Sequence, residues 1–183
     1  GRDDAAFSSL LWPATGERLT AESFARYRAE GGWVISGNRS EETNAWIVAQ
    51  PDVMVASDGI PFLYGPAHPR GSGTFSRILG HYSRDQQTVG LMDALKKMTL
   101  LPAQRLENIA PVMRNKGRIR LGADADITLF DPDTILDRST YEQGDIPSQG
   151  IVHVLVSGTF VVRNGELIEG IFPGRAIKSE HSR

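Results

Sequence analysis

The stretch of sequence that decides the fold is residues 53–59, Val-Met-Val-Ala-Ser-Asp-Gly. An uninterrupted apolar run leads here into an Asp-Gly pair, which is typical of a strand buried on both faces and followed by a tight turn. A shorter apolar run, Trp-Val-Ile at 33–35, is bounded by the turn residues Ser-Gly-Asn. The sequence therefore predicts buried strands at 33–35 and 53–56.

Helical patterns precede and separate these two strands. Thr20 is a suitable cap for a helix over 20–30, and Ser40 for a second helix over 40–50. Helices that alternate with continuous apolar strands indicate a parallel sheet covered on both faces. Two parallel strands would leave both edges open, so this layout requires more strands than the visible ones.

The next part of the chain is a long loop followed by helices. Residues 57–72 are rich in Gly and Pro and show little periodicity, a pattern that favours a functional or disordered loop. Helical spacing resumes over 74–82 and 89–99, and Pro102 stands in the first turn of a helix over 102–108.

After about residue 116 the pattern changes to short strands punctuated by turns. Asn164-Gly165 is the strongest hairpin signal in the chain. This part is predicted to form a small antiparallel sheet, and residues from 178 onward are expected to fray. The predicted strands are 126–130, 151–156, 160–163 and 166–168.

Composition excludes several classes of protein. A net charge of -2 and a pI near 6.1 provide no basic field for nucleic acid. No apolar run approaches the ~18 residues that a membrane span requires, and the absence of cysteine excludes disulfides and thiolate metal sites. We expect a cytoplasmic protein.

A start at Gly1 without Met fits a fragment or N-terminal processing equally well.

Asp58 is the first candidate for chemistry, because it follows a predicted buried strand where parallel α/β folds place catalytic groups. A carboxylate there could bind a metal or move a proton. The alternative is an ordinary turn aspartate.

Arg70 and His68 lie in the loop beyond Asp58. The planar guanidinium of Arg70 suits a two-point contact with a substrate carboxylate, and the alternative is a solvated surface arginine. No two of the four histidines have the spacing of a chelating pair, so His81, His153 and His181 are most simply structural or surface residues. The sequence predicts no complete metal site, and it contains no phosphate loop or nucleophile elbow.

Together these motifs resemble the N-acyl-D-amino-acid deacylases of the metal-dependent amidohydrolase superfamily. Residues 53–59, His-Pro-Arg-Gly-Ser-Gly-Thr-Phe at 68–75 and Arg-Ile-Leu-Gly-His-Tyr at 77–82 look like that family's final barrel strand and the loop after it. Leu-Gly-Ala-Asp-Ala-Asp-Ile at 121–127 is similar to the return toward a flanking β-sandwich. The likeness covers roughly 53–175 and is looser over 1–52.

The resemblance implies an α/β architecture in which the last βα units of a TIM-type (β/α) barrel are followed by part of a small antiparallel β-sandwich. The barrel part would be 1–115, the sandwich strands 116–178 and the frayed tail 179–183. The implied reaction is hydrolysis of a linear amide, N-acyl-D-amino acid deacylation, by water that zinc or another divalent metal activates.

Position by position, the resemblance matches Asp58 to the general acid/base and possible metal ligand. It matches Arg70 to the residue that binds the α-carboxylate. His68 is a weaker substrate-binding candidate, and Tyr64 borders the same loop without an assigned role. The family's other metal ligands lie upstream of anything present here, so we expect the chain alone to bind no metal and to be inactive.

The implied partners are a small N-acyl amino acid and either a second copy of the chain or the missing N-terminal part, with no nucleic acid and no membrane. Two alternatives stay open. A cyclic amidase, similar to dihydroorotase or hydantoinase, is disfavoured by the loop at 68–70, which suits an acyclic substrate with a free carboxylate. The other is a non-catalytic oligomerising module that kept the scaffold.

Overall fold

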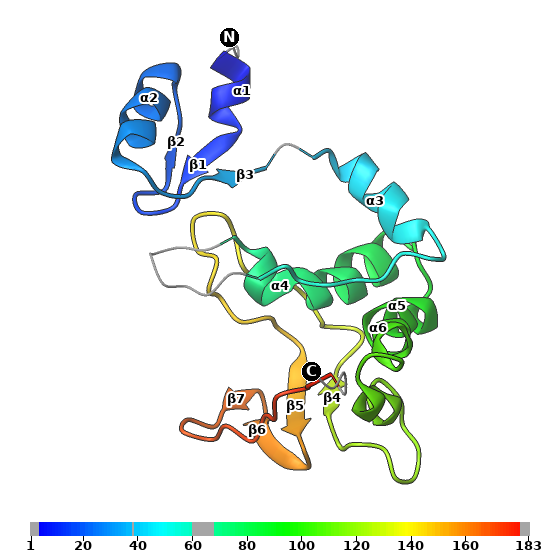
Figure 1. Cartoon of the computed structure of the whole chain (residues 1–183). Coiled ribbons are helices and arrows are strands. Elements are labelled where there is room, and N and C mark those ends of the chain that lie inside the picture. Colours follow the sequence, from blue (N-terminus) through cyan, green and yellow to red (C-terminus); the bar gives the residue numbers. More distant parts are fainter. Residues whose placement is uncertain (1–3, 38, 60–67, 180–183) are drawn as a thin grey trace.

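A computed structural model describes residues 4–37, 39–59 and 68–179 of the chain. It is a mixed α/β structure with two small antiparallel sheets joined by a central group of helices (Figure 1). The elements are, in chain order, α1 (Asp4–Ser8), β1 (Leu10–Trp12), β2 (Glu17–Arg18), α2 (Ala21–Glu30), β3 (Ile35–Ser36), α3 (Glu41–Ala49), α4 (Arg70–Arg77), the π-helix η1 (Ile78–Asp85), α5 (Leu91–Met98), α6 (Leu100–Leu106), the 3-10 helix η2 (Pro111–Asn115), β4 (Ile127–Phe130), β5 (Ile151–Val156), β6 (Thr159–Arg163) and β7 (Glu166–Leu167).

The N-terminal sheet has the strand order β2-β1-β3. Its central strand buries Leu11 completely, and α2 lies beside it with Tyr27 stacked on Trp12 at a centroid distance of 4.2 Å. Helix α2 begins in a capping box, in which Thr20 accepts the Ser23 N–H and the Ser23 hydroxyl accepts the Thr20 N–H. The cap that the sequence predicts for this helix is thus confirmed.

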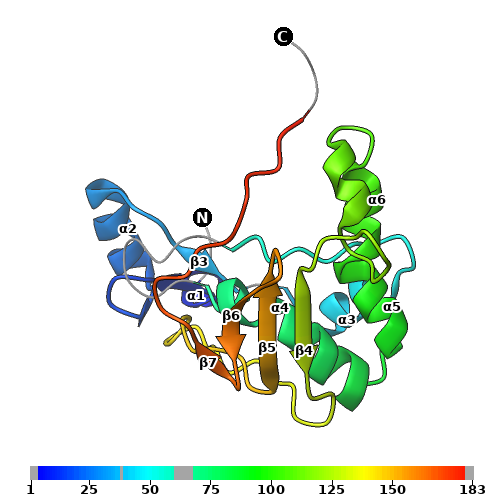
Figure 2. The same ribbon diagram turned by 90° about the horizontal axis from the view of Figure 1, so that it is seen from below.

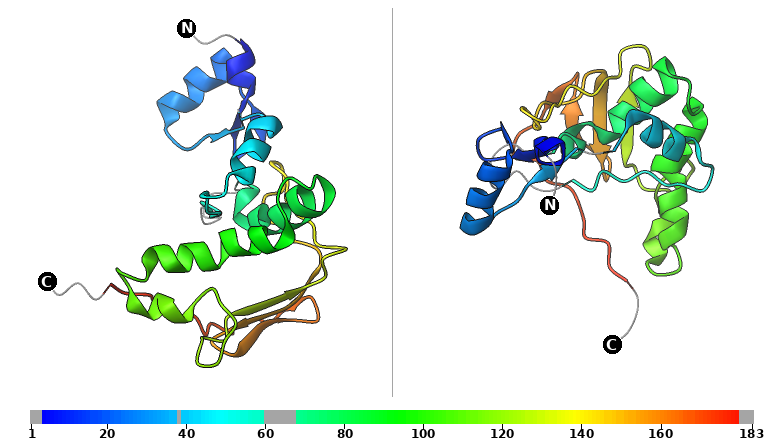
Figure 3. Two further views of the ribbon diagram at one scale, coloured as in Figure 1. Left: turned by 90° about the vertical axis from the view of Figure 1, so that its right-hand side faces the viewer. Right: turned by 90° about the horizontal axis from the view of Figure 1, so that it is seen from above.

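The central helices form the main apolar core. Helix α4 continues directly into η1, and η1 packs against α5. Figure 2 shows the C-terminal sheet in front of α4, and in the left view of Figure 3 the central helices lie between the blue N-terminal part and the orange C-terminal sheet. Gly80 allows this close packing, because a Cβ atom at this position would lie 2.4 Å from the Ile135 carbonyl oxygen. Buried residues of the cluster are Val48, Ile78, Leu79, Tyr82, Val89, Ala94 and Ile135.

Lys97 of α5 is buried, at 3% exposure, and connects the helices to the segment before Asp58. Its ammonium donates to the Gln50 carbonyl at the end of α3 and to the Val53 carbonyl at 3.2 Å. The Lys97 carbonyl in turn accepts the Val55 N–H at 3.1 Å. A buried charge is tolerated only with such hydrogen-bond partners, so this lysine ties α5 to the chain that leads to Asp58.

The C-terminal sheet is an antiparallel meander with the order β4-β5-β6-β7. Positive φ angles of 54° and 81° at Asn164 and Gly165 form the predicted hairpin turn, and Ser157-Gly158 forms a second turn of the same kind. The antiparallel sheet that the sequence predicts for this part is confirmed. The division of the chain at residue 115 stays a prediction.

The two predicted parallel strands are wrong in the described part of the chain. At 33–35 only Ile35 enters a strand, β3, and it pairs antiparallel with β1, while Trp33 is 70% exposed. Residues 53–56 form no strand. A strand requires a neighbour whose backbone accepts and donates its hydrogen bonds, and none of the described segments lies beside 53–56 in that way.

Each predicted helix has a helical counterpart in the structure, with different ends. The predicted loop at 57–72 ends earlier than expected, because α4 begins at Arg70, and its residues 60–67 lie outside the described residues. The helix expected at 74–82 changes at Ile78 to the π form, which side-chain periodicity does not indicate. Among the helices described, none is long and apolar enough to cross a membrane.

Candidate active site

Asp58 and Arg70 are paired in the structure. The Arg70 Nη2 atom lies 2.9 Å from Asp58 Oδ2, and the Arg70 Nε–H donates to the Asp58 backbone carbonyl at 2.8 Å. The Asp58 side chain is 80% exposed and that of Arg70 34% exposed. Two of the three predicted site residues therefore pair through their side chains, and the Asp58 carboxylate is accessible to solvent.

The backbone conformation of Asp58 is unusual for a residue with a side chain. Its φ angle is 49°, in the left-handed region that aspartate tolerates better than most residues. The following Gly59 N–H donates to the Ser57 hydroxyl at 3.2 Å. A predicted Asp-Gly turn is thus present, and it directs the Asp58 carboxylate toward Arg70.

His68 contacts the backbone of Arg70. Its Nδ1 atom accepts the Arg70 backbone N–H at 3.1 Å. Burial lowers the pKa of His68, the nearby Arg70 charge lowers it further, and Asp58 opposes both effects. The ring is therefore neutral at pH 7, as an acceptor nitrogen must be. Tyr64 lies outside the described residues.

The segment between β4 and β5 adds residues to the site that the sequence did not indicate. Ser139 donates to the Pro69 carbonyl at 2.9 Å, and Tyr141 contacts the His68 ring edge-on with a centroid distance of 5.0 Å. These residues stand about 70 positions after their partners and carry no motif. Nothing in the local sequence identifies them, because only the path of the chain brings them close.

The remaining histidines stand apart from Asp58. His81 of η1 contacts Glu41 at 2.8 Å and Gln86 at 3.0 Å, and Arg77 pairs with Glu41 at 3.3 Å. Burial raises the pKa of Glu41, but hydrogen bonds from Tyr82 and His81 and the Arg77 charge outweigh it and lower the pKa.

His153 accepts the Asn164 N–H at 3.1 Å, within the C-terminal sheet. His181 lies outside the described residues. The interpretation of His81 and His153 as structural or surface residues fits these contacts.

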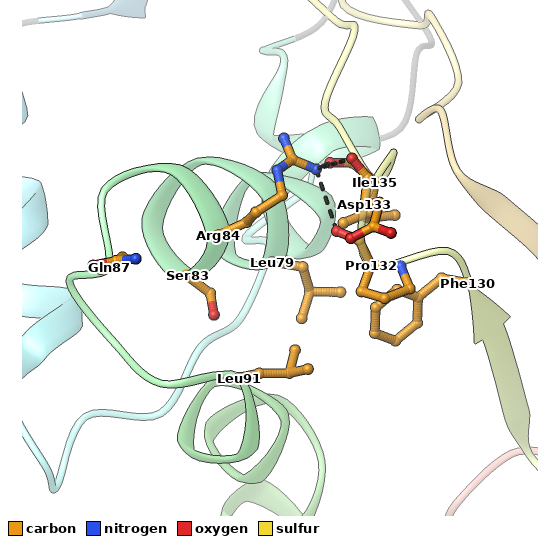
Figure 4. Close-up of a pocket in the computed structure, with 9 residues that line it drawn as sticks. All are labelled: Leu79, Ser83, Arg84, Gln87, Leu91, Phe130, Pro132, Asp133 and Ile135. Atoms are coloured by element: carbon orange, nitrogen blue, oxygen red, sulfur yellow. Dashed lines mark hydrogen bonds between the residues drawn. The ribbon is translucent and has the colours of Figure 1, made fainter.

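A pocket of about 290 Å³ lies between η1 and the chain that follows β4 (Figure 4). Leu79, Leu91 and Phe130 line it with apolar atoms. Its cation, Arg84, already donates to the Asp133 carbonyl at 3.1 Å and the Ile135 carbonyl at 2.8 Å, and it pairs with Asp85. Because its hydrogen bonds are satisfied, Arg84 serves to join η1 to the chain after β4.

A metal requires several ligands in one place, and the described residues do not fit one. Over 4–37, 39–59 and 68–179, no three His, Asp or Glu side chains come close enough to hold an ion. Asp58 stands alone as a candidate ligand, with Arg70 as its charged neighbour.

Comparison with known proteins identifies related chains. A family model described as "Amidohydrolase family" matches residues 23–162. The chain is similar to the N-acyl-D-glutamate deacylase of Alcaligenes xylosoxydans xylosoxydans, with 45% identity over 108 residues that cover 59% of this chain and 21% of the relative. It is also similar to the N-acyl-D-aspartate deacylase of the same organism, with 37% identity over 131 residues, 72% of this chain and 25% of the relative.

Solved structures agree with these relatives. A crystal structure of a D-aminoacylase matches with a TM-score of 0.77 and 30% identity, covering 92% of this chain and 37% of that one. A second match is an N-acyl-D-glutamate deacylase from Bordetella bronchiseptica, complexed with zinc and a phosphonate mimic of the tetrahedral intermediate. It has a TM-score of 0.73 and 30% identity, and the match covers 90% of this chain and 38% of that one.

The chain thus spans roughly a fifth to a quarter of the length of the curated relatives. The family model covers most of the chain, including Asp58 and Arg70, and it confirms the resemblance that the motifs at 53–82 indicate. The chain therefore belongs to the amidohydrolase family.

Proposed function

We propose that the chain forms part of a hydrolase that deacylates N-acyl-D-amino acids, with Arg70 binding the substrate carboxylate and Asp58 moving a proton. The observation that carries this proposal is the exposed Asp58–Arg70 pair, at 2.9 Å. The names of the relatives support the substrate class, because they act on acylated D-glutamate and D-aspartate. In the solved relatives this chain would correspond to barrel units and sheet strands.

Arg70 suits the role of a carboxylate anchor for a geometric reason. Its guanidinium already makes a two-point contact with Asp58, through one nitrogen to the side chain and another to the backbone. A planar fork of this kind binds a carboxylate with two parallel hydrogen bonds, which orients the ligand as well as holding it. An amino-acid carboxylate would thereby place the neighbouring amide close to Asp58.

Asp58 suits proton transfer, because its carboxylate is exposed and adjacent to the bound ligand. Amide hydrolysis requires a water molecule to lose a proton as its oxygen bonds to the carbonyl carbon, and the leaving nitrogen to gain one as the C–N bond breaks. One carboxylate can accept the first proton and return it to the nitrogen. The products are a carboxylate and a free D-amino acid.

A metal is expected for this chemistry in the family, since one solved relative is complexed with zinc and another, a D-aminoacylase, has a binuclear metal center. The described residues supply at most Asp58 to such a site. We therefore assign this chain only part of the active site, and we derive no metal-dependent step from its residues alone.

The alternatives are less well supported. The relatives are deacylases of linear N-acyl-D-amino acids, which disfavours a cyclic amidase. Association with a second copy or with a further part of the barrel stays a prediction. Light scattering would test it, and a monomer at all concentrations would contradict self-association.

Calorimetric titration with N-acetyl-D-alanine and with N-acetyl-D-alaninamide, which lacks the carboxylate, tests the anchor. We expect the acid to bind about tenfold more tightly, the effect of one charge-assisted contact at a partly exposed site. Arg70→Lys should reduce this preference, since a lysine keeps the positive charge but cannot make the two-point contact. Arg28→Lys, an exposed arginine of α2, is the matched control. Equal affinities for acid and amide in the unaltered chain would contradict the proposal.

A further inference from the structure

The segment between β4 and β5 closes over the turn that leads into α4. Ser139 donates to the Pro69 carbonyl at 2.9 Å, and Ser148 donates to the Ser72 carbonyl at 3.0 Å. Arg77, at the end of α4, pairs with Asp137 at 3.3 Å. Figure 1 shows this segment, in yellow, passing the start of α4 on its way to β5. The turn at 68–72 is thus held from outside by a part of the chain that belongs to the C-terminal sheet.

The start of α4 has an unusual cap. Pro69 occupies the cap position and makes no side-chain hydrogen bond there. The first backbone N–H groups of a helix have no partner inside the helix, so another acceptor is needed. His68 provides it, since its Nδ1 atom accepts the Arg70 N–H at 3.1 Å. The orientation of the His68 ring therefore decides whether the first helical residue, Arg70, is held.

Tyr141 contacts the His68 ring that makes this hydrogen bond. Its ring meets the His68 ring at an interplanar angle of 70° and a centroid distance of 5.0 Å, the edge-to-face arrangement that aromatic pairs favour. Both side chains are half-buried. The Arg18 guanidinium lies 5.3 Å from the centroid of the Tyr141 ring and restrains it further. A rotated His68 ring would lose either this contact or its hydrogen bond to Arg70.

We propose that Tyr141 is a positioning residue for Arg70, acting through the His68 ring. The contact chain runs from Tyr141 to His68, from His68 Nδ1 to the Arg70 N–H, and from the Arg70 guanidinium to Asp58. Its consequence for ligands rests on the proposed function, because it assumes that Arg70 binds the substrate carboxylate. The C-terminal sheet would then contribute to substrate recognition without touching the substrate.

The first experiment tests the contact chain without a substrate. In the full chain, ¹⁵N NMR of His68 should show an unprotonated Nδ1, and the Arg70 amide should exchange slowly with solvent. Tyr141→Phe keeps the ring and should preserve both signals. Tyr141→Leu removes the ring edge and should mix the His68 tautomers and speed Arg70 amide exchange about tenfold. Unchanged signals in Tyr141→Leu would overturn the inference.

A second variant excludes a general loss of folding as the cause. His68→Phe keeps an aromatic ring against Tyr141 and removes both ring nitrogens, including the Nδ1 acceptor of the Arg70 N–H. It should expose the Arg70 amide to exchange as Tyr141→Leu does, while the thermal midpoint stays close to that of the unaltered chain. Slow Arg70 exchange in His68→Phe would show that another group holds the N–H, and it would also overturn the inference.

The titration with N-acetyl-D-alanine and its amide separates this inference from the proposed function. Tyr141→Leu should weaken binding of the acid about tenfold and leave the amide unchanged, while Tyr141→Phe binds both like the unaltered chain. If Tyr141→Leu binds the acid normally, the inference fails and the proposed function stands. If the unaltered chain shows no preference for the acid, the proposed function fails, and the NMR result alone decides whether Tyr141 positions Arg70.

Discussion

Arg70 holds Asp58 at two points, through its Nη2 atom to the carboxylate at 2.9 Å and through its Nε–H to the backbone carbonyl at 2.8 Å. The second contact uses the backbone of Asp58 and does not involve its carboxylate. The arginine therefore fixes the position of the turn, while the carboxylate, 80% exposed, stays accessible to a ligand.

Asp58→Asn should change the stability of the chain by less than about 1 kcal/mol, because an exposed ion pair contributes little. Asparagine also tolerates the φ angle of 49° at this position. Asp58→Ala should cost about 1 kcal/mol more than Asp58→Asn, since alanine is strained in the left-handed region. Urea unfolding of both variants measures the difference. A loss above about 2 kcal/mol in Asp58→Asn would show that the carboxylate is structural.

Lys97→Met should destabilise the chain by about 2 kcal/mol, the range for hydrogen bonds made by a charged group. The variant keeps the apolar length of the side chain and leaves the carbonyls of Gln50 and Val53 without their donor. Lys96→Met, at the exposed neighbouring position, is the control and should change stability by less than about 0.5 kcal/mol. Equal unfolding midpoints for the two variants would show that the buried ammonium is dispensable.

Asp126 should make stability depend on pH in the acid range. A hydrogen bond from Lys116 lowers the pKa of Asp126, the Ser157 N–H at 2.7 Å lowers it further, and burial opposes them. A folded-state pKa below the unfolded value of 3.8 stabilises the protein above that pH. This contribution is lost as the pH falls through the folded-state pKa.

Asp126→Asn should therefore lower the unfolding free energy by about 1 kcal/mol at pH 6. The difference from the unaltered chain should begin to shrink once the pH falls below 3.8, and it should vanish as the pH passes below the folded-state pKa. Urea unfolding between pH 3 and 7 measures it. Asp52→Asn, at an exposed position, is the control and should follow the unaltered chain throughout. A difference that grows as the pH falls would contradict the sign of the effect.

Removal of divalent metal should leave the stability of this chain unchanged. A metal whose free concentration is a hundred times its dissociation constant stabilises the folded state by about 2.7 kcal/mol, which a thermal melt detects easily. No group of three metal-binding side chains exists in the described part of the chain. The thermal midpoint should thus agree within about 1 °C between samples with EDTA and with excess zinc. A clear upward shift of the thermal midpoint with zinc would contradict this prediction, because it would show that the chain has metal ligands outside those described.

The sequence alone determined the features that depend on neighbours within a few residues. The caps at Thr20 and Ser40 and the Asn164-Gly165 turn are where the sequence predicts them. Each arises from a side chain or a φ angle acting on the adjacent backbone, so a short stretch of sequence is sufficient.

Only the tertiary structure decided the features that depend on distant segments. Residues 53–56 have the composition of a buried strand and form none, because a strand exists only where a neighbour completes its hydrogen bonds. Tyr141 and Ser139 reach the turn at 68–72 because the path from β4 to β5 carries them there. Local sequence cannot specify such contacts, since they depend on how sheets and helices pack across the whole chain.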